Sequence, residues 1–285
     1  MRLCFIAFFF LPTLLFATER HQVVLLLTNP RAVSTAFEKS MIARKDLKVF
    51  HEPWVSSYMY NHGFHETVFS QLPPEEIVNT KNFDEVKELI FSYAEKQPVF
   101  VKDMIWCMID ELRGDTSLIA DTHVVMTFLI RDPVKSIESF YAKAIEWNEP
   151  ATVDGFISFC FRYDVIYELA KKHYEIKGEW PVIVDAEDLC REPERIMEAY
   201  CERVGIPFIP EALSWKSGMP DEWRHLANWH DKAAESNGFV SNERSDTERF
   251  LMIPETSLDH VEAIYRQQKP YYDKLLELRL KGRDV

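Results

Sequence analysis

The sequence predicts an α/β fold of three layers, in which helices cover both faces of a central, mostly parallel sheet. Short apolar runs alternate along the chain with longer segments of helical periodicity, and this alternation is typical of parallel sheets. Residues 122–130 form a nearly continuous run of β-branched and aromatic side chains, as expected of a strand covered on both faces. Only 8 of the 285 residues are glycine, which disfavours a loop-rich or repeat architecture.

Residues 1–17 have the pattern of a secretory signal peptide, and residues 18–285 are expected to form a single domain. Arg2 precedes an apolar run over 3–16, and the small Ala17 suits a cleavage site. The run is shorter than the roughly 20 apolar residues that cross a membrane, so no stable membrane span is expected. A signal anchor and a first core strand are the alternatives. The prediction is an exported or secretory-pathway protein, or a cytoplasmic one if the segment is not processed.

Charge and cysteine content exclude several functions. A net charge of −13 provides no basic field for a polyanion, so general binding of nucleic acid or of anionic membranes is not expected. An anionic ligand must therefore meet a local group of donors. The cysteines beyond the signal segment show no C-x-x-C spacing, which predicts buried thiols rather than a zinc site or a disulfide framework. They are Cys107, Cys160, Cys190 and Cys201.

An anion site is predicted where the first strand passes into the first helix. The apolar run 23–27 predicts a buried strand, Pro30 interrupts it, and Ser34 and Thr35 are expected to cap the next helix. A strand, a tight loop and a helix in this order direct backbone N–H groups and the positive end of a helix dipole at one point. Arg31 adds a permanently charged fork of donors. The alternative is an ordinary connection with an exposed arginine.

A second anion site is predicted at the end of the strand over 122–130. Asp132 can cap the helix that follows and Pro133 suits its first position, which leaves Arg131 at the carboxyl end of the strand. Ser139 lies on that helix. Arg131 and Ser139 can share a phosphate, the first as a bidentate charge and the second as a neutral donor. Two such sites on adjacent strands suggest a ligand with two separated phosphates.

Titratable side chains follow two further predicted strands. His51 and Glu52 come directly after the second strand, on the edge where open α/β sheets bind ligands, and Pro53 is expected to hold Glu52 extended. Lys102 comes at the end of a third strand, where it can neutralise an anionic group or pair with Asp103. A solvated turn residue is the alternative for Glu52.

The segments TNPRAVSTAF and RDPVKSIESFY together resemble the PAPS-dependent sulfotransferases, PAPS being 3′-phosphoadenosine 5′-phosphosulfate. PVIVDAEDLCREPERIMEAYCERVGIPF resembles the family's late strand and helix, so the resemblance spans about residues 23–208. It implies a P-loop-like sulfotransferase fold, PAPS as co-substrate and no metal. It assigns the 5′-phosphosulfate to Pro30, Arg31, Ala32, Val33, Ser34, Thr35 and Ala36, and the 3′-phosphate to Arg131 and Ser139.

The resemblance implies transfer of a sulfuryl group from PAPS to a hydroxyl or amine acceptor, with release of 3′,5′-ADP. In that reaction Glu52 is the expected base and His51 its reserve. Arg31 would stabilise the departing phosphate, and Lys102 would contact the sulfuryl group. The chain differs from many family members in having arginine rather than lysine at position 31, and it has no convincing R-K-G loop late in the sequence.

Two other functions remain open at this stage. One is a nucleotide-binding module of the same fold that has lost catalysis. The other is a P-loop kinase-like phosphotransferase, although the first loop lacks the G-K-[ST] that would bind a γ-phosphate and magnesium. The sequence identifies neither the acceptor nor the oligomeric state.

Overall fold

The computed structural model describes residues 20–62, 82–146, 148–223, 229–241 and 249–282. Within these residues the chain forms a five-stranded sheet in the order β2-β3-β1-β4-β5, and every pair of neighbouring strands is parallel. The central strand is therefore the first in the sequence. The strands are β1 (Val23–Thr28), β2 (Lys48–His51), β3 (Val99–Met104), β4 (Val124–Ile130) and β5 (Val182–Asp185).

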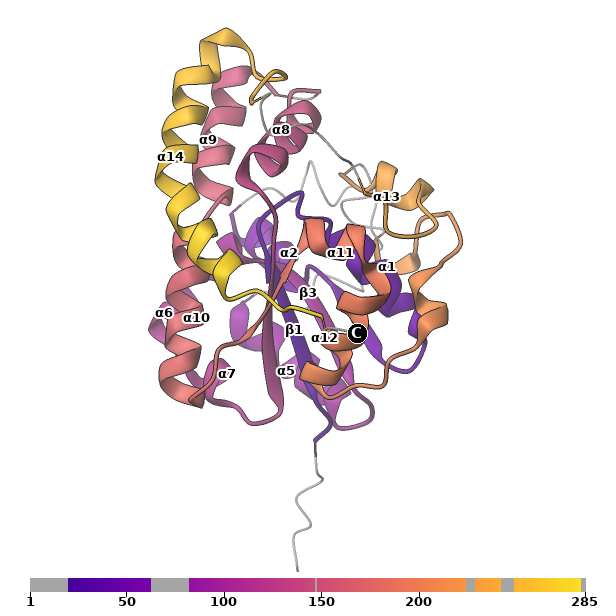
Figure 1. Cartoon of the computed structure of the whole chain (residues 1–285). Coiled ribbons are helices and arrows are strands. Elements are labelled where there is room, and N and C mark those ends of the chain that lie inside the picture. Colours follow the sequence, from indigo (N-terminus) through magenta and orange to yellow (C-terminus); the bar gives the residue numbers. More distant parts are fainter. Residues whose placement is uncertain (1–19, 63–81, 147, 224–228, 242–248, 283–285) are drawn as a thin grey trace, which may run out of the picture.

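Helices lie on both sides of this sheet (Figure 1). Connections through helices are required because parallel strands cannot be joined by tight hairpins. The α-helices are α1 (Ser34–Arg44), α2 (Pro53–Asn61), α5 (Phe83–Ala94), α6 (Ile109–Gly114), α7 (Ser117–Ala120), α8 (Pro133–Ala144), α9 (Pro150–Cys160), α10 (Tyr163–Lys177), α11 (Ala186–Arg191), α12 (Pro193–Val204), α13 (Asp231–Glu235) and α14 (Glu255–Glu277). Short 3₁₀ turns are η1 (Ile105–Cys107), η2 (Pro210–Leu213) and η3 (Asp221–Trp223).

The alternation of side chains along β1 divides the core into two layers. Val23, Leu25 and Leu27 belong to a large hydrophobic cluster that includes residues of α2, α5, α8, α9, α10 and α14. Val24 and Leu26 point to the other face and pack with α1, α11 and α12. All five side chains are almost completely buried, which explains why the run shows no polar alternation. The predicted three-layer architecture is confirmed.

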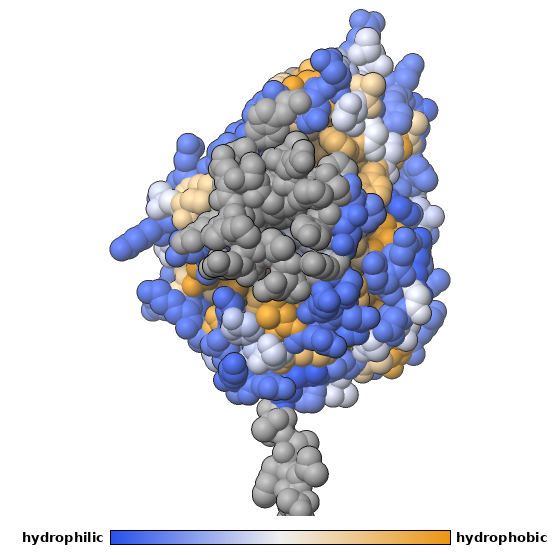
Figure 2. Space-filling model, turned by 180° about the vertical axis from the view of Figure 1, so that it is seen from behind, coloured by the Kyte–Doolittle hydropathy of each residue, from blue (hydrophilic) through white to orange (hydrophobic). Residues whose placement is uncertain are grey.

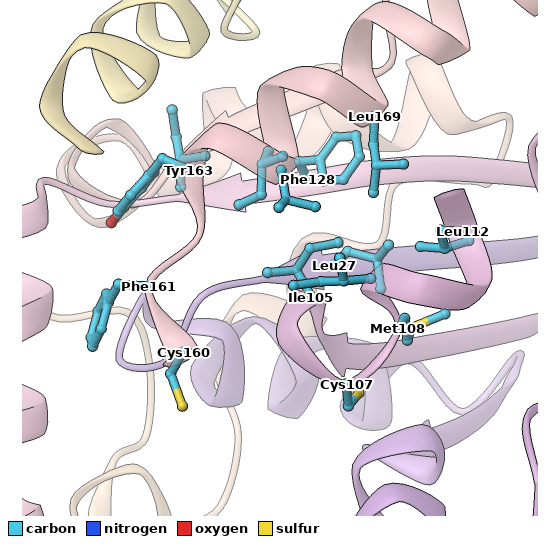
Figure 3. Packing of buried hydrophobic residues seen from close by; sticks show 14 of the residues in the cluster. Leu27, Ile105, Cys107, Met108, Leu112, Phe128, Cys160, Phe161, Tyr163 and Leu169 are labelled. Atoms are coloured by element: carbon cyan, nitrogen blue, oxygen red, sulfur yellow. The ribbon is translucent and has the colours of Figure 1, made fainter. Parts of the chain in front are cut away.

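The larger layer connects the core with the carboxyl edge of the sheet. Figure 3 shows Leu27 of β1 and Phe128 of β4 packed near Ile105, with Tyr163 at the start of α10. The hydroxyl of Tyr163 donates a hydrogen bond of 2.6 Å to the carbonyl oxygen of Arg131. A buried core residue thus fixes the backbone at one of the predicted anion sites.

The surface and termini bear on two further predictions. In the face opposite to that of Figure 1, hydrophilic residues surround smaller hydrophobic areas (Figure 2). Among the described helices, none has the combination of length and apolar character needed to cross a bilayer. Residues 1–19 lie outside the described residues, so the signal peptide stays a prediction.

The four cysteines within the described residues are free thiols, and among them only Cys190 is partly rather than fully buried.

Candidate active site

The predicted site residues gather along the carboxyl edge of the sheet, because parallel strands all end on the same side. The loop after β1 lies in the middle of this edge, since β1 is the central strand. His51, Glu52 and Lys102 come from β2 and β3 on one side of it. Arg131 and Glu187 follow β4 and β5 on the other side. The edge therefore carries two chemically different groups of residues that flank one loop.

The loop after β1 has an unusual backbone. Arg31 and Val33 adopt positive φ angles of 62° and 67°. Residues other than glycine rarely adopt this left-handed conformation. Each such residue costs on the order of 1–3 kcal/mol and persists only where surrounding contacts enforce it. Backbone N–H groups that converge at left-handed residues form concave sites for anions. The conformation supports the predicted anion-binding loop.

The start of α1 differs from the expectation. The helix begins at Ser34, and its N-cap is Val33, which makes no side-chain cap hydrogen bond. Ser34 and Thr35 therefore lie inside the first turn rather than capping it. The first intrahelical bond runs from the N–H of Phe37 to the carbonyl oxygen of Val33 at 3.1 Å. The N–H groups of residues 34–36 precede that bond and point to the end of the helix where anions bind.

Arg31, Arg131 and Ser139 are brought together although 100 residues separate the two arginines. Nη1 of Arg131 donates to the carbonyl oxygen of Arg31 at 3.0 Å. Nε of Arg31 donates to Oγ of Ser139 at 3.0 Å, and its Nη1 donates to the carbonyl oxygen of Trp229 at 3.1 Å. Burial and the nearby charge of Arg131 both lower the pKa of Arg31. Two guanidinium groups thus converge where a bound anion would relieve their repulsion.

A buried ionic cluster lies on the other side of the loop. The Lys102 ammonium forms an ion pair with Oε1 of Glu52, and it lies 3.7 Å from Oε2 of Glu38. Oε2 of Glu38 also bonds to Nδ1 of His51 at 2.7 Å. Nε2 of His51 in turn lies 3.0 Å from Nε2 of His230. All five residues are at least 94% buried, so these contacts act in a medium that screens charge weakly.

The charge states in this cluster follow from its contacts. Burial by itself would raise the pKa of Glu52, but Lys102 and His51 outweigh it and hold that pKa below its ordinary value. For Lys102 burial acts to lower the pKa, and the carboxylates of Glu52 and Glu38 raise it overall. Glu52 is therefore an ionised carboxylate and Lys102 an ammonium at neutral pH.

The backbone of Glu52 corrects a second expectation. Glu52 has a φ angle of 46°, so it adopts a left-handed conformation rather than the extended one expected before Pro53. Its N–H still donates to the carbonyl oxygen of Lys102 at 2.8 Å, which continues the pairing of β2 with β3. The combination of this bond with the helix that starts at Pro53 forces the turn. Strained residues of this kind cluster at functional sites.

Lys102 and Asp103 lie within β3 rather than after it, because pairing with β1 extends the strand to Met104. They point to opposite faces, as successive strand residues do. Asp103 does not bind Lys102. Its carboxylate instead accepts hydrogen bonds from the N–H groups of Trp54 at 2.7 Å and Met104 at 2.8 Å. The alternative of a Lys102–Asp103 pair is therefore wrong, and Lys102 is directed at Glu52.

His51, Glu52 and His230 offer ligand atoms within 4.8 Å of one another, and these residue types bind transition metals. The same atoms already have partners, because the two imidazoles face each other and Lys102 occupies the Glu52 carboxylate. A cation in that space would also lie beside the Lys102 ammonium. The contacts describe a buried network of hydrogen bonds and ion pairs in which these ligand atoms are already engaged.

Several residues of this candidate site were not predicted from the sequence. Glu38 has the position of an acid in the first turns of a helix, which carries no signal of a site, and His230 lies in a segment of weak pattern. Glu187 accepts from Nε of Arg131 at 3.1 Å and from Nζ of Lys135 at 2.6 Å. The signal available for Glu187 was its position just after β5, on the same edge as the other site residues.

Lys39 of α1 anchors the segment that carries Trp229 and His230. Its Nζ donates to four carbonyl oxygens at 3.0–3.2 Å, those of Gly218, Ala233, Ala234 and Ser236. We expect Lys39→Met to lower the free energy of unfolding by about 2–3 kcal/mol, because several charge-assisted hydrogen bonds are lost at once. Urea denaturation measures this change. The exposed Lys232→Met in the same segment is the control, and an equal midpoint for both variants would contradict the anchoring role.

The parallel sheet, its strand order and the helices on both of its faces define a three-layer α/β protein. The family model described as "Sulfotransferase domain" matches residues 23–249. The chain therefore belongs to the sulfotransferase domain family. Membership supports a sulfotransferase activity and confirms the predicted fold.

Curated relatives are long proteins that match over part of their length. Branched-chain-amino-acid aminotransferase-like proteins 1 and 2 of Arabidopsis thaliana are 25% and 24% identical over 214 and 218 residues, which is 74% and 75% of this chain and 35% and 36% of theirs. The chain thus spans about a third of their length. Sulfotransferase ppzF of Metarhizium majus is 27% identical over 108 residues, which is 34% of this chain and 32% of that protein.

Two solved structures match most of this chain at low sequence identity. A sulfotransferase domain from the curacin biosynthetic pathway is 14% identical, with a TM-score of 0.43 over 87% of this chain and 98% of its own. Mouse sulfotransferase SULT7A1, solved in complex with PAP, is 10% identical, with a TM-score of 0.42 over 93% of this chain and 87% of its own.

Proposed function

We propose that this protein transfers the sulfuryl group of PAPS to a hydroxyl or amine acceptor and releases 3′,5′-ADP. The observation that carries the proposal is the arrangement along the sheet edge. Arg31 and Arg131 converge on one side of the loop after β1, and the Glu52–Lys102 pair lies on the other. A site for a nucleotide with two phosphate-type groups and a base for the acceptor are the two requirements of this reaction, and each has its own group of residues.

The donor would be held by residues of β1, α1 and β4. The N–H groups at residues 34–36 and the Arg31 guanidinium suit the 5′-phosphosulfate, because they combine a helix N-terminus with a bidentate cation. Arg131 and Ser139 suit the 3′-phosphate. Since Arg31 already contacts both Ser139 and the backbone of Trp229, its guanidinium would exchange these neutral partners for phosphate oxygens.

Glu52 is the proposed base because it is ionised, buried and fixed next to Lys102. The acceptor oxygen or nitrogen attacks sulfur and gives its proton to Glu52. The new bond to sulfur forms as the bond between sulfur and the bridging phosphate oxygen breaks. The 5′-phosphate of 3′,5′-ADP takes the electron pair of the broken bond, and Arg31 stabilises its charge.

Lys102 has two roles in this scheme. Before the donor binds, it keeps Glu52 charged in a site that would otherwise favour the neutral acid. When the sulfuryl oxygens arrive, the ammonium can shift part of its interaction to them, and the carboxylate becomes a stronger base as it loses that partner. His51 stays the reserve base, since Glu38 orients its Nδ1 and leaves Nε2 directed at the cluster.

A titration with 3′,5′-ADP tests the donor site, with Arg131→Ala as the variant. Loss of the contacts to the 3′-phosphate should weaken binding by about 1.5–3 kcal/mol, the range for hydrogen bonds to charged groups. Isothermal calorimetry without magnesium measures the affinity. Equal affinity for wild type and variant would contradict the assignment of Arg131.

Measurements of PAPS turnover and of ATP binding, added to this titration, distinguish the other candidate functions. Binding of 3′,5′-ADP without turnover of PAPS, over a panel of phenols, alcohols and amines, would indicate a nucleotide-binding module without catalysis. Magnesium-dependent binding of ATP, with no binding of 3′,5′-ADP, would indicate a phosphotransferase. Either result would overturn the proposed reaction.

A further inference from the structure

The Arg131 guanidinium, which the proposed function assigns to the 3′-phosphate, is already paired with a carboxylate of this chain. Oε1 of Glu187 accepts a hydrogen bond from Nε of Arg131 at 3.1 Å. The side chains of Arg131 and Glu187 are only 14% and 27% exposed, so the pair is largely shielded from water. Glu187 therefore places a negative charge beside Arg131, where the 3′-phosphate of the proposed ligand would also place one.

Glu187 is held by a second cation that does not depend on Arg131. Its Oε2 accepts from Nζ of Lys135 at 2.6 Å, and Lys135 lies in the first turn of α8. Glu187 itself lies at the start of α11, where Asp185 caps the helix by accepting from the N–H of Glu187 at 3.0 Å. Its backbone is thus fixed, and one carboxylate oxygen keeps a partner whether or not the other is bound to Arg131.

Arg131 is not fully occupied by this contact. Its Nη1 donates to the Arg31 carbonyl oxygen, and its Nη2 makes no hydrogen bond to any of the described residues. An incoming phosphate can engage Nη2 first, before Nε is released. The exchange of one anion for another at a single guanidinium then needs no unpaired charge at any step.

We propose that Glu187 is a specificity-determining residue that competes with the 3′-phosphate of the donor nucleotide for Arg131. In the free protein Glu187 neutralises Arg131, and nucleotide binding moves the guanidinium from the carboxylate to the phosphate while Lys135 retains Glu187. The competition lowers the affinity for every 3′-phosphorylated nucleotide, including the product 3′,5′-ADP, and so favours product release. It leaves nucleotides without a 3′-phosphate unaffected, because they do not displace Glu187. This inference rests on the proposed function.

The test compares the affinities of 3′,5′-ADP and 5′-AMP for the full-length protein and its variants by calorimetry. Glu187→Gln removes the charge and keeps the shape of the side chain. We expect it to raise the affinity for 3′,5′-ADP about two- to fivefold, the effect of losing one partly exposed ion pair, and to leave the affinity for 5′-AMP unchanged. In the background of Arg131→Ala, Glu187→Gln should give no such gain.

Glu192→Gln is the matched control, because it removes the same charge nearby from a residue that pairs with Arg191 and Arg195 instead. An equal gain for both nucleotides, or the same gain in the control, would show a general charge effect and overturn the inference. A loss of affinity in Glu187→Gln would make Glu187 a support for Arg131, and an unchanged affinity would remove it from the site; both overturn the competition. If the wild type binds neither nucleotide, the proposed function fails and the inference falls with it.

Discussion

Glu52→Gln is expected to reduce the turnover of PAPS by about 10²- to 10⁴-fold, the range in which a positioned general base contributes. The amide cannot accept the acceptor's proton, yet it retains an oxygen that can accept a hydrogen bond from Lys102. Release of 3′,5′-ADP from PAPS, in the presence of the most active acceptor from the phenol, alcohol and amine panel, measures the effect. Affinity for 3′,5′-ADP should stay at the wild-type value because Arg31 and Arg131 are untouched.

The pH dependence of the wild type distinguishes Glu52 from His51 as the base. The pKa of Glu52 is held below its ordinary value by Lys102 and His51, so the base form persists as the pH falls through the mildly acidic range. Turnover should therefore stay level from about pH 7.5 down to about pH 5.5. A histidine base with the ordinary imidazole pKa of about 6.5 would instead cause a decline within that interval.

His51→Gln is the companion variant for this experiment. If Glu52→Gln retains turnover while His51→Gln loses it, the base is His51 and the assignment of Glu52 is wrong. The opposite pattern supports Glu52. A circular dichroism spectrum and an unchanged affinity for 3′,5′-ADP confirm that each variant is folded.

Local patterns were sufficient to predict the architecture and to place Arg31 and Arg131 on the same edge of the sheet. The strands appear as apolar runs because both faces of the sheet are covered, as in β1 and β4. Arg31 and Arg131 could be placed on one edge because each follows directly after such a run. Their contact through the Arg31 carbonyl oxygen then follows from the pairing of β1 with β4.

The buried ionic cluster was predicted only in part, because its members meet through tertiary contacts. Glu38 is buried on α1, where it reaches His51 of β2, and nothing in the local pattern of the helix shows this. His230 reaches the same cluster from a segment almost 180 residues away from His51. The backbone strain at Glu52 was also not predicted from the sequence. Pro53 predicts an extended backbone at Glu52, but pairing with β3 and the start of α2 impose a left-handed conformation.

The division of the sheet edge into two halves has a physical reason. Two guanidinium groups raise the local positive potential at the donor site, which suits a nucleotide with several negative charges. The Glu52 carboxylate, the proposed base, must stay negatively charged. The positive potential at the proposed donor site would attract this carboxylate towards the arginines. Lys102 supplies Glu52 with a cation of its own, which keeps the carboxylate within its half of the site.

Lys102→Met is therefore expected to destabilise the protein by about 3–5 kcal/mol at pH 7, because it leaves the buried carboxylates of Glu52 and Glu38 without their shared cation. Urea denaturation at pH 7 measures this loss. Without the ammonium, burial raises the pKa of Glu52 above its value in the unfolded chain. A raised pKa favours folding at low pH, so the difference from the wild type should shrink as the pH falls from 7 towards 5.

The double variant Lys102→Met with Glu52→Gln tests whether the loss comes from the unpaired charge. Removing both partners of a buried ion pair often changes stability little, so the double variant should recover the part of the loss that comes from the unpaired Glu52 carboxylate. Glu38 keeps its charge in this variant, so the recovery should be partial and the dependence on pH between 5 and 7 should become weaker. Equal losses in the single and the double variant would mean that Lys102 acts through packing, and the charge relation between Lys102 and Glu52, from which the role of Glu52 as base was derived, would have to be abandoned.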